Sequence, residues 1–531
     1  MSSYTYPGVY VQELPSAVHT ITGVATSIAA FVGWAPMGPT DEAVLVQNWS
    51  EYQAQFGGLY PNVYLGYAVN QFFGNGGSQA YIIRIVDNAS ATPCAPASLG
   101  TKIGGLTLYA SSVGVWGDNI QVTLTLSPAD HTRFSILVQQ VITSGSTTTT
   151  TTLENFTNLS FNPSDPQGNY VVAVIDNDSN YISFIDPSTG AGPSTGPTGS
   201  PAAITATKLS GGKDGDVLYP TAGSTGAFED ALNVWGAAHI PAQSGIPLLD
   251  GVFFNLLAVP GMTDAPTIQK LQTFCQSPDN RAFYIVDPPK SATVSGLGGT
   301  GPVGSSSGSI TAEPESSNSA YYFPWVSAPD PLAGNRPSLF PPSGFVAGIY
   351  AATDASRGVW KAPAGIDAGL SGVSGLQYTL SDSQNGTLNV LAVNCLRNFP
   401  VYGNVVWGAR TLDGNSSVGS QWQYVPIRRF ALFLESSLYQ GTQWAVFEPN
   451  DETLWGQLRL NIGAFMQGLF QQGAFAGTTP QQAYFVKCDA ENNPQASIDQ
   501  GIVTVLVGFA PLYPAEFVVI QIQQMAGMAP S

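Results

Sequence analysis

The amino-acid sequence predicts a multidomain protein of the α+β class, and three observations support this prediction. The chain has 531 residues, enough for roughly three or four domains. It contains 58 glycines and 39 prolines, a composition that favours turns, strands and loops over long helical bundles. Hydrophobic residues make up 44% of the chain, which is enough to fill several cores and excludes a largely disordered protein.

The N-terminal region begins with a segment that is expected to stand apart from the first core strand. Residues 4–13 (YTYPGVYVQE) alternate as a strand does, and Pro7 restricts them to a sheet edge or a separate arm, because proline cannot donate to a central ladder. The next expected elements are a buried strand over 23–34 that ends at Pro36, a helix over 48–56 capped by Ser50, a helix over 64–73 and a strand over 80–86.

Residues from about 90 to 215 have the pattern of an all-β insertion. The strand-like pieces are 121–126, 133–140, 170–175 and 181–185. They alternate with Thr147–Thr152 and with a Pro/Gly/Ser/Thr stretch at 187–201. The threonine run is interpreted as a loop or edge strand, and a glycan or ligand platform is the alternative.

The middle region changes to an α/β pattern. A strand over 252–259, a helix capped by Thr263 or Asp264 and a strand over 282–286 form a βαβ unit, which implies parallel pairing. The pattern continues with a strand over 321–326, helices over 343–356 and 387–397, and a strand over 404–407.

The last hundred residues alternate again between helices and strands. The expected elements are a helix over 427–439, a strand over 443–447, an amphipathic helix over 451–470, and strands over 483–488, 501–510 and 515–523. Asp451 and Glu452 favour the N-terminus of the amphipathic helix because of the helix dipole.

The charge of the chain argues against several classes of partner. With 17 cations and 35 acids the net charge is −18, so neither nucleic-acid wrapping nor adhesion to an anionic membrane is expected. Residues 336–487 hold nine of the cations and eight acids. This is interpreted either as a near-neutral region within an acidic protein or as a chance variation in the composition of a solvated surface. No apolar run approaches ~18 residues and no signal peptide is visible, so a soluble protein made in a cytoplasm is expected.

The sequence offers no active site. Only His19, His131 and His239 could serve as a general base, and His239 is interpreted as a loop or core residue. Four scattered cysteines and three histidines do not form a zinc set or a disulfide framework. We therefore expect no catalytic residue, no cofactor and no metal site.

Several blocks of the sequence resemble the contractile tail sheath family, and they occur in the order expected for that family. The blocks are YPGVYVQE (6–13), GVATS (23–27), AFVG (30–33), GP (38–39), FFGNGG (72–77), YIIRI (81–85), RGVWKAPAG (357–365), WQYVPIRR (422–429), GTQWAVFEPND (441–451) and PAEFVV (514–519). Residues 90–240 show no such block, which fits an outward-facing insertion that varies between members.

The resemblance implies a division of the chain into five parts. These are an N-terminal arm (1–20), an N-terminal part of the sheath core (21–92), an outer all-β insertion (93–215), a subtilisin-like α/β domain without a catalytic triad (240–415), and an α+β C-terminal sheath domain that carries a second arm (420–531).

The resemblance also implies a function. Subunits of this family stack as hexameric rings around an inner tube, and contraction of this helical homo-oligomer drives the tube through a target envelope. The implied partners are the inner tube, the baseplate and terminator or cap proteins, with no nucleic acid and no membrane insertion. Assembly is expected in the bacterial cytoplasm, as part of a phage tail, a bacteriocin-like particle or a released injection particle.

Two sets of residues follow as candidates. The arms are expected to pair with neighbouring subunits by strand addition, through Tyr6, Val9, Val11, Phe517, Val519 and Ile522. The alternative is that the two termini pair within one subunit. The candidates that face the tube are Arg459, Arg428 and Arg429, because they lie in the region richest in cations.

Two other functions were weighed against the sheath. A hydrolase of subtilisin-like fold is the second hypothesis. It is disfavoured because no histidine stands in the sequence context of a catalytic base. A surface adhesin is suggested by the threonine-rich insertion, and the absent signal peptide argues against it.

Overall fold

A computed structural model describes residues 19–87, 93–220, 226–232, 244–302, 316–415 and 419–521. By its internal contacts the chain divides into two units. The larger unit is Thr26–Arg429, and the smaller unit combines Met1–Ala25 with Phe430–Ser531. The predicted arm residues Tyr6, Val9 and Val11, together with Ile522, lie outside the described residues.

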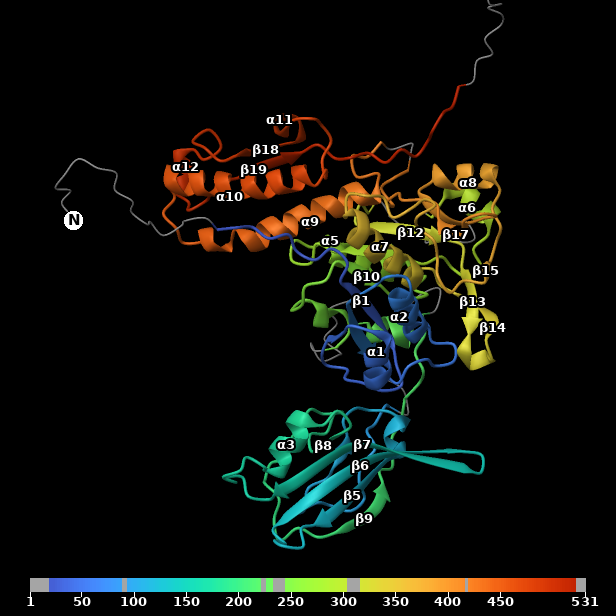
Figure 1. Ribbon diagram of the computed structural model, residues 1–531, viewed down its shortest axis with the longest axis vertical. Helices are drawn as coiled ribbons and strands as arrows, with labels where there is room; N and C mark the ends of the chain where they lie inside the picture. Colours follow the sequence, from blue (N-terminus) through green and yellow to red (C-terminus); the bar gives the residue numbers. More distant parts are fainter. Residues whose placement is uncertain are drawn as a thin grey trace, which may run out of the picture. The chain divides into compact units, whose positions relative to one another are not determined.

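The larger unit contains a mixed sheet that is parallel at its centre (Figure 1). In the described part of the chain its strand order is β17-β16-β12-β11-β10-β1-β3-β2, and only the edge strands β17 and β2 pair in antiparallel fashion. The strands are β1 (Ala29–Trp34), β2 (Val44–Val46), β3 (Ala80–Ile85), β10 (Leu256–Ala258), β11 (Phe283–Val286), β12 (Ser319–Phe323), β16 (Val393–Phe399) and β17 (Gly403–Val406). The predicted βαβ unit is confirmed, since β10 and β11 pair in parallel.

This sheet joins two stretches of sequence that are far apart. Ala29 of β1 pairs with Leu256 of β10 on one side and with Ala80 of β3 on the other. Residues 21–92 and 240–415, which the sequence analysis treated as two parts, therefore share one sheet. Central strands such as β1 and β11 are buried along their whole length, as expected for a parallel sheet covered on both faces.

Helices surround the sheet and one pair of them approaches closely. α2 (Tyr64–Gly74) packs on α7 (Ser343–Arg357), and a Cβ on Gly344 would lie 2.6 Å from the Ala68 backbone. The remaining elements are α1 (Trp49–Phe56), α4 (Ala227–Ala231), η2 (Ile246–Leu249), α5 (Ala265–Gln276), α6 (Val294–Thr300), η3 (Pro331–Ala333), α8 (Asp382–Asn389) and a sheet of β13 (Val326–Asp330), β14 (Arg336–Phe340) and β15 (Gly375–Leu376).

Residues 97–209 form mainly β structure with a hydrophobic core of their own. Its antiparallel sheet has the order β7-β6-β5-β9, so β7, which begins with the threonine run, is an edge strand as predicted. The elements are β4 (Tyr109–Ala110), η1 (Val115–Asn119), β5 (Ile120–Leu126), β6 (Arg133–Ser144), β7 (Thr147–Ser160), α3 (Val171–Asp178), β8 (Ile182–Ser183) and β9 (Ile204–Lys208).

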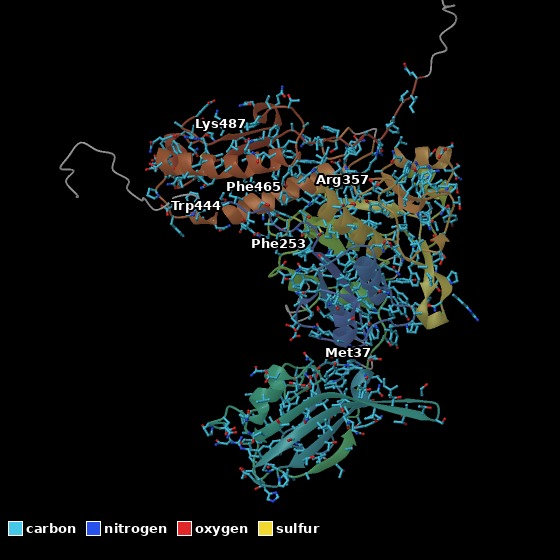
Figure 2. All side chains as sticks on the ribbon, in the orientation of Figure 1. Met37, Phe253, Arg357, Trp444, Phe465 and Lys487 are labelled. Carbon is cyan, nitrogen blue, oxygen red and sulfur yellow. The ribbon has the colours of Figure 1, made fainter. Side chains whose placement is uncertain are left out.

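The smaller unit packs two helices with a two-stranded sheet. α9 (Val425–Gly441) crosses the division between the units, and its residues from Phe430 onwards belong to the smaller one. The other elements are η4 (Gln443–Ala445), α10 (Glu452–Gln471), α11 (Pro480–Ala483), β18 (Tyr484–Lys487), α12 (Gln495–Ile498) and β19 (Leu506–Phe509). Lys487 lies on β18 and Trp444 in η4 (Figure 2). In the described residues no helix has the length and apolar character needed to cross a bilayer.

Four sequence expectations about elements are wrong. Residues 170–175 are not a strand, because Val171 and Ile175 are buried four residues apart on one helical face of α3. Residues 387–397 are not one helix. α8 ends at Asn389, Ala392 has a φ of 63°, and β16 with Cys395 follows.

Within 443–447, Gln443–Ala445 form the 3-10 turn η4 rather than a strand. Residues 515–521 have no regular secondary structure within one chain, and a strand there that pairs with a neighbouring subunit stays a prediction. The first helix is capped by Asn48 instead of Ser50, since the Asn48 side chain accepts the Glu51 backbone N–H.

Candidate functional site

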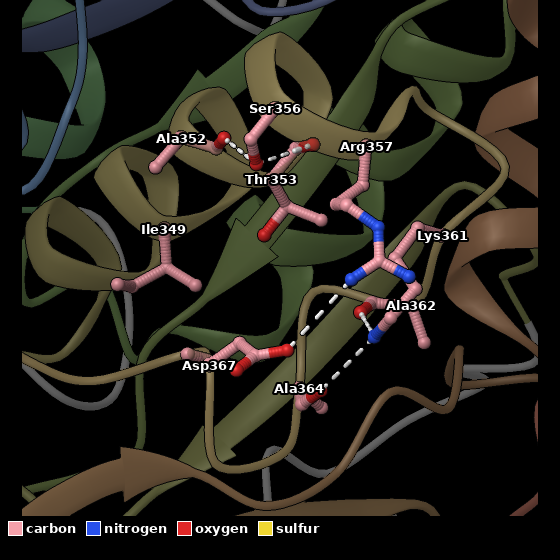
Figure 3. A pocket seen from close by; sticks show the side chains of 10 residues that line it. Ile349, Ala352, Thr353, Ser356, Arg357, Lys361, Ala362, Ala364 and Asp367 are labelled. Carbon is pink, nitrogen blue, oxygen red and sulfur yellow. Dashed lines mark hydrogen bonds and ion pairs between the residues drawn. The ribbon is translucent and has the colours of Figure 1, made fainter.

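A small pocket lies at the C-terminal end of α7, within the RGVWKAPAG block (Figure 3). Arg357 is the last residue of the helix, and Gly358 follows it with a φ of 86°. A Cβ on Gly358 would lie 2.4 Å from the Trp360 ring, so this turn requires glycine. The turn brings Lys361 back beside the helix end, where Lys361 and Arg357 line the same pocket.

The loop that closes the pocket is held on the edge of the sheet. The Gly365 N–H donates to the Val406 carbonyl at 2.9 Å, and the Val406 N–H donates to the Ala368 carbonyl at 3.0 Å. Both bonds attach the loop to β17. The pocket therefore has a wall from α7 and a wall that is anchored to a strand of the central sheet.

The charges in the pocket are incompletely balanced. Arg357 and Asp367 approach to 3.9 Å, and their side chains are 60% and 77% exposed. The Lys361 ammonium donates to the carbonyls of Ala362 at 2.9 Å and Ala364 at 3.4 Å (Figure 3). Burial, and then the nearby Arg357 cation, lower the pKa of Lys361. Two cations and one carboxylate give the pocket a net positive charge.

Arg429, a predicted tube-facing residue, lies in the interior of the larger unit. Its guanidinium binds Asp354 of α7 through two hydrogen bonds of 2.6 and 3.0 Å and donates to the Thr26 carbonyl at 2.8 Å. The two paired side chains are 3% and 2% exposed. A side chain buried in this way offers no surface to another protein, so we do not retain Arg429 as a contact.

The other two candidate cations are more accessible. Arg428 donates to the Asn318 side chain at 2.8 Å and lies over the Trp422 ring at 4.9 Å. Arg459 on α10 pairs with Glu452 at 2.6 Å and donates to the Cys488 carbonyl. Its side chain is 35% exposed, so Arg459 is the better candidate of the two for a contact with another chain.

The C-terminal segment carries apolar side chains that the described part of its own chain does not cover. Residues 512–521 have no regular secondary structure. Phe517 and Val519, the predicted arm residues, are 72% and 80% exposed, and Val518 and Ile520 are exposed to a similar degree. Four consecutive exposed apolar residues are unusual on a monomer and are typical of a contact with another chain.

The structure describes two of the three histidines considered as a general base. His19 stacks on Trp444 with ring centroids 4.1 Å apart, His131 lies in an exposed turn, and His239 is outside the described residues. None of the four cysteines forms a disulfide, and all four are buried. Within the described ranges, no three His, Cys, Asp or Glu side chains are grouped as a metal site would require.

The structure shows two buried polar residues, Asp287 and Arg84, that the sequence analysis did not single out. Asp287, at the end of β11, accepts hydrogen bonds from the Gly261 N–H, the Ser343 N–H and the Ser343 hydroxyl at 2.7–2.9 Å. Burial raises its pKa to about 6. Arg84 is fully buried and donates to the carbonyls of Ala35, Pro36, Gly38 and Val113.

A signal for each of these groups is present in the sequence. Asp287 is an acid directly after a wholly apolar strand, and Arg84 is the first cation of the chain and stands inside a β-branched run. Burial lowers the pKa of Arg84 to about 10.

Comparison with known families decides the identity of the chain. Residues 242–412 match the model of the phage tail sheath protein central domain, and residues 417–525 match that of the phage tail sheath C-terminal domain. Together the two models account for more than half of the 531 residues. The chain belongs to the contractile tail sheath family. The pocket at Arg357 lies inside the central sheath domain, and the exposed C-terminal segment lies inside the C-terminal sheath domain.

Two curated sheath proteins share sequence with part of this one. The tail sheath protein of Vibrio phage KVP40 is 25% identical over 185 residues, which are 35% of this chain and 26% of the phage protein. A putative prophage major tail sheath protein of Pseudomonas aeruginosa is 28% identical over 186 residues, which are 35% of this chain and 46% of that protein. The matched part is thus less than half the length of these relatives.

Solved sheath structures share the fold over nearly the whole chain. The sheath of an extracellular contractile injection system, in its contracted state, matches with a TM-score of 0.56 and 22% identity, covering 99% of each chain. A sheath tail protein from Listeria innocua matches with a TM-score of 0.58 and 13% identity, covering 93% of this chain and 97% of that one. This sheath protein therefore has the mixed α/β multidomain fold of those structures.

Proposed function

We propose that this chain is the structural subunit of a contractile sheath. The subunits stack as hexameric rings around an inner tube, and contraction of the lattice drives the tube through a target envelope. The observation that carries the proposal is the match to both sheath domain models, with the contracted injection-system sheath covered over 99% of its chain. The energy for contraction would come from subunits held in a less favourable packing and released into a denser one.

We propose that the terminal segments connect the subunits. The support comes from residues 517–520, which are exposed and apolar and have no strand partner among the described residues of their own chain. The edges of the antiparallel pair β18–β19 could accept such a segment from a neighbour. Each backbone hydrogen bond contributes about 1 kcal/mol, and repetition over a lattice makes the total large. Residues 1–20 are assigned the same role from the family resemblance.

The remaining parts are assigned by the same proposal. The region 240–415, whose sheet also includes strands of 21–92, is subtilisin-like and has lost catalysis, and residues 93–215 are an outer insertion whose core is its own. The partners are the inner tube, the baseplate and a terminator or cap protein. Assembly takes place in the bacterial cytoplasm, and the particle is a phage tail or a released injection system. Arg459 is the candidate contact with the tube.

Truncation tests the role of the C-terminal segment. Removal of residues 515–531 should leave a folded monomer that no longer polymerises, because the connecting strand is lost. Sedimentation and electron microscopy report polymerisation, and far-UV circular dichroism reports folding. The control is Val401→Ser with Tyr402→Ser, which removes exposed apolar surface from the turn between β16 and β17 and should leave polymerisation intact. Cylinders of normal length from the truncated chain would refute the connecting role.

A further inference from the structure

We propose that the pocket at Arg357 and Lys361 binds the carboxylate of an Asp or Glu side chain from the smaller unit of a second copy of this chain. This inference rests on the proposed function, since it requires copies that meet in a lattice. It assigns the lattice a charged contact at a site distinct from the terminal segments.

The donors in the pocket call for an anion. The guanidinium of Arg357 has five N–H donors. Its nearest carboxylate in the described part of the chain, Asp367, is 3.9 Å away, which is too far for a hydrogen bond. The Lys361 ammonium has three donors and gives two of them to carbonyls. A carboxylate placed between the two cations would accept from both and would relieve the repulsion between them.

The size of the pocket limits what can occupy it. The cavity measures about 70 Å³. On this measure a single water needs about 10–15 Å³, so the pocket has room for a small polar group. A carboxylate at the end of a side-chain stem does fit.

The charge of the smaller unit favours it as the source of the carboxylate. Residues 430–531 contain eight acids and only two cations, Arg459 and Lys487. This unit also carries the exposed segment 517–520 that the proposed lattice uses for contact. A second copy that docks through this segment brings an acidic surface with it. Opposite charges on the two surfaces set the register of such a contact and add to its rate of formation.

Cross-linking on polymerised protein tests the assignment directly. A carbodiimide joins a lysine amine to a carboxylate without a spacer, so it reports contacts of a few ångströms. Polymer grown from a 1:1 mixture of ¹⁴N- and ¹⁵N-labelled chains should yield a mixed-isotope peptide that joins Lys361 to an acid within 430–521. The monomer should not yield it. The internal control is Lys487–Glu491, an ion pair within one chain that should cross-link in both samples.

The outcomes separate this inference from the proposed function. Polymer in which Lys361 joins only Asp367 of its own chain, an acid of the insertion, or an acid of the inner tube overturns the assigned occupant. Lys361→Arg keeps the charge and should remove the cross-link while polymers still form. Protein that never forms polymers overturns the proposed function, and the pocket assignment fails with it.

Substitution provides a second, independent readout. Arg357→Gln with Lys361→Gln should raise the critical concentration for polymerisation about tenfold at low salt, and the effect should shrink at high salt. Arg336→Gln, which removes an exposed cation from β14, is the matched control and should have no such effect. An unchanged critical concentration in the double variant would overturn the pocket assignment.

Discussion

Helix α7 contributes one residue to each of two Asp–Arg pairs, and the two pairs have opposite properties. Asp354 and Arg429 form two short hydrogen bonds in the interior, beneath the Tyr350 ring, which lies 4.6 Å from the guanidinium. One turn further along, Arg357 faces Asp367 at 3.9 Å with both side chains largely in solvent. Arg429 of the first pair makes three hydrogen bonds within its own chain, whereas Arg357 of the second makes only a loose ion pair among the described residues.

The difference separates residues that hold the fold from residues that can meet another chain. Desolvated charges are stable only while each has its partner, so the inner pair is required for the folded state. Exposed pairs at this distance contribute about 0–1 kcal/mol, so the outer pair is nearly dispensable for folding. Arg429 and Arg357 have the same side-chain chemistry, and the burial of the side chain is what distinguishes them.

The largest expected effect comes from breaking the inner pair. Arg429→Met should lower the free energy of unfolding of unassembled protein by about 3–5 kcal/mol, because Asp354 would remain charged and buried without its partner. Urea denaturation followed by tryptophan fluorescence measures it. Arg429→Met combined with Asp354→Leu should recover much of this loss. A double variant as unstable as the single one would show that the pair is not the cause.

The next largest effect is a pH dependence of the unfolding free energy, caused by Asp287 at the N-terminal end of α7. The pKa of Asp287 is about 6 in the folded chain, whereas an unfolded aspartate has a pKa of about 3.9. The folded state therefore binds the proton more tightly, and the stabilisation is fully present below pH ~4 and lost as pH rises through ~6.

Asp287→Asn removes this titration. Relative to the variant, the wild-type chain should lose on the order of 3 kcal/mol of unfolding free energy between pH 4 and pH 7. Urea titrations of both proteins at several pH values measure the difference. A difference that stays constant over this range would mean that Asp287 titrates normally.

The smallest effect on stability is expected at the outer pair. Arg357→Met should change the free energy of unfolding of unassembled protein by less than about 0.5 kcal/mol, because the side chain is mostly solvated and its ion pair is loose. The same urea measurement tests this. A loss of 2 kcal/mol or more, on the scale of a buried pair, would remove the distinction between the two ends of α7.

Much of the central sheet was predictable from the sequence, because its signals are local. The apolar strands at 80–85 and 283–286 and the helix capped by Asp264 show clear periods and caps, and the structure confirms them. The edge strand at Thr147 follows from its composition. The type of an element was predicted wrongly where a short apolar run fits both the helix and the strand period, as at Val171. It was also predicted wrongly where a residue with positive φ interrupts the pattern, as at Ala392.

The site was predictable only in part, because burial depends on contacts between residues far apart in the chain. The cation-rich region was recognised, yet the sequence does not show that Arg429 meets Asp354, 75 residues away, while Arg428 points elsewhere. The RGVWKAPAG block was recognised as a family signature without the pocket it builds. That pocket depends on the turn at Gly358 and on the loop attached to β17.

Electron cryomicroscopy of the polymerised full-length chain tests the central claim most directly. The account predicts hollow cylinders with axial striations, built from six-subunit rings, in which residues 515–521 lie as a strand on a neighbouring subunit. Discrete closed oligomers or monomers under conditions that favour assembly, or a C-terminal segment folded onto its own subunit within cylinders, would contradict it.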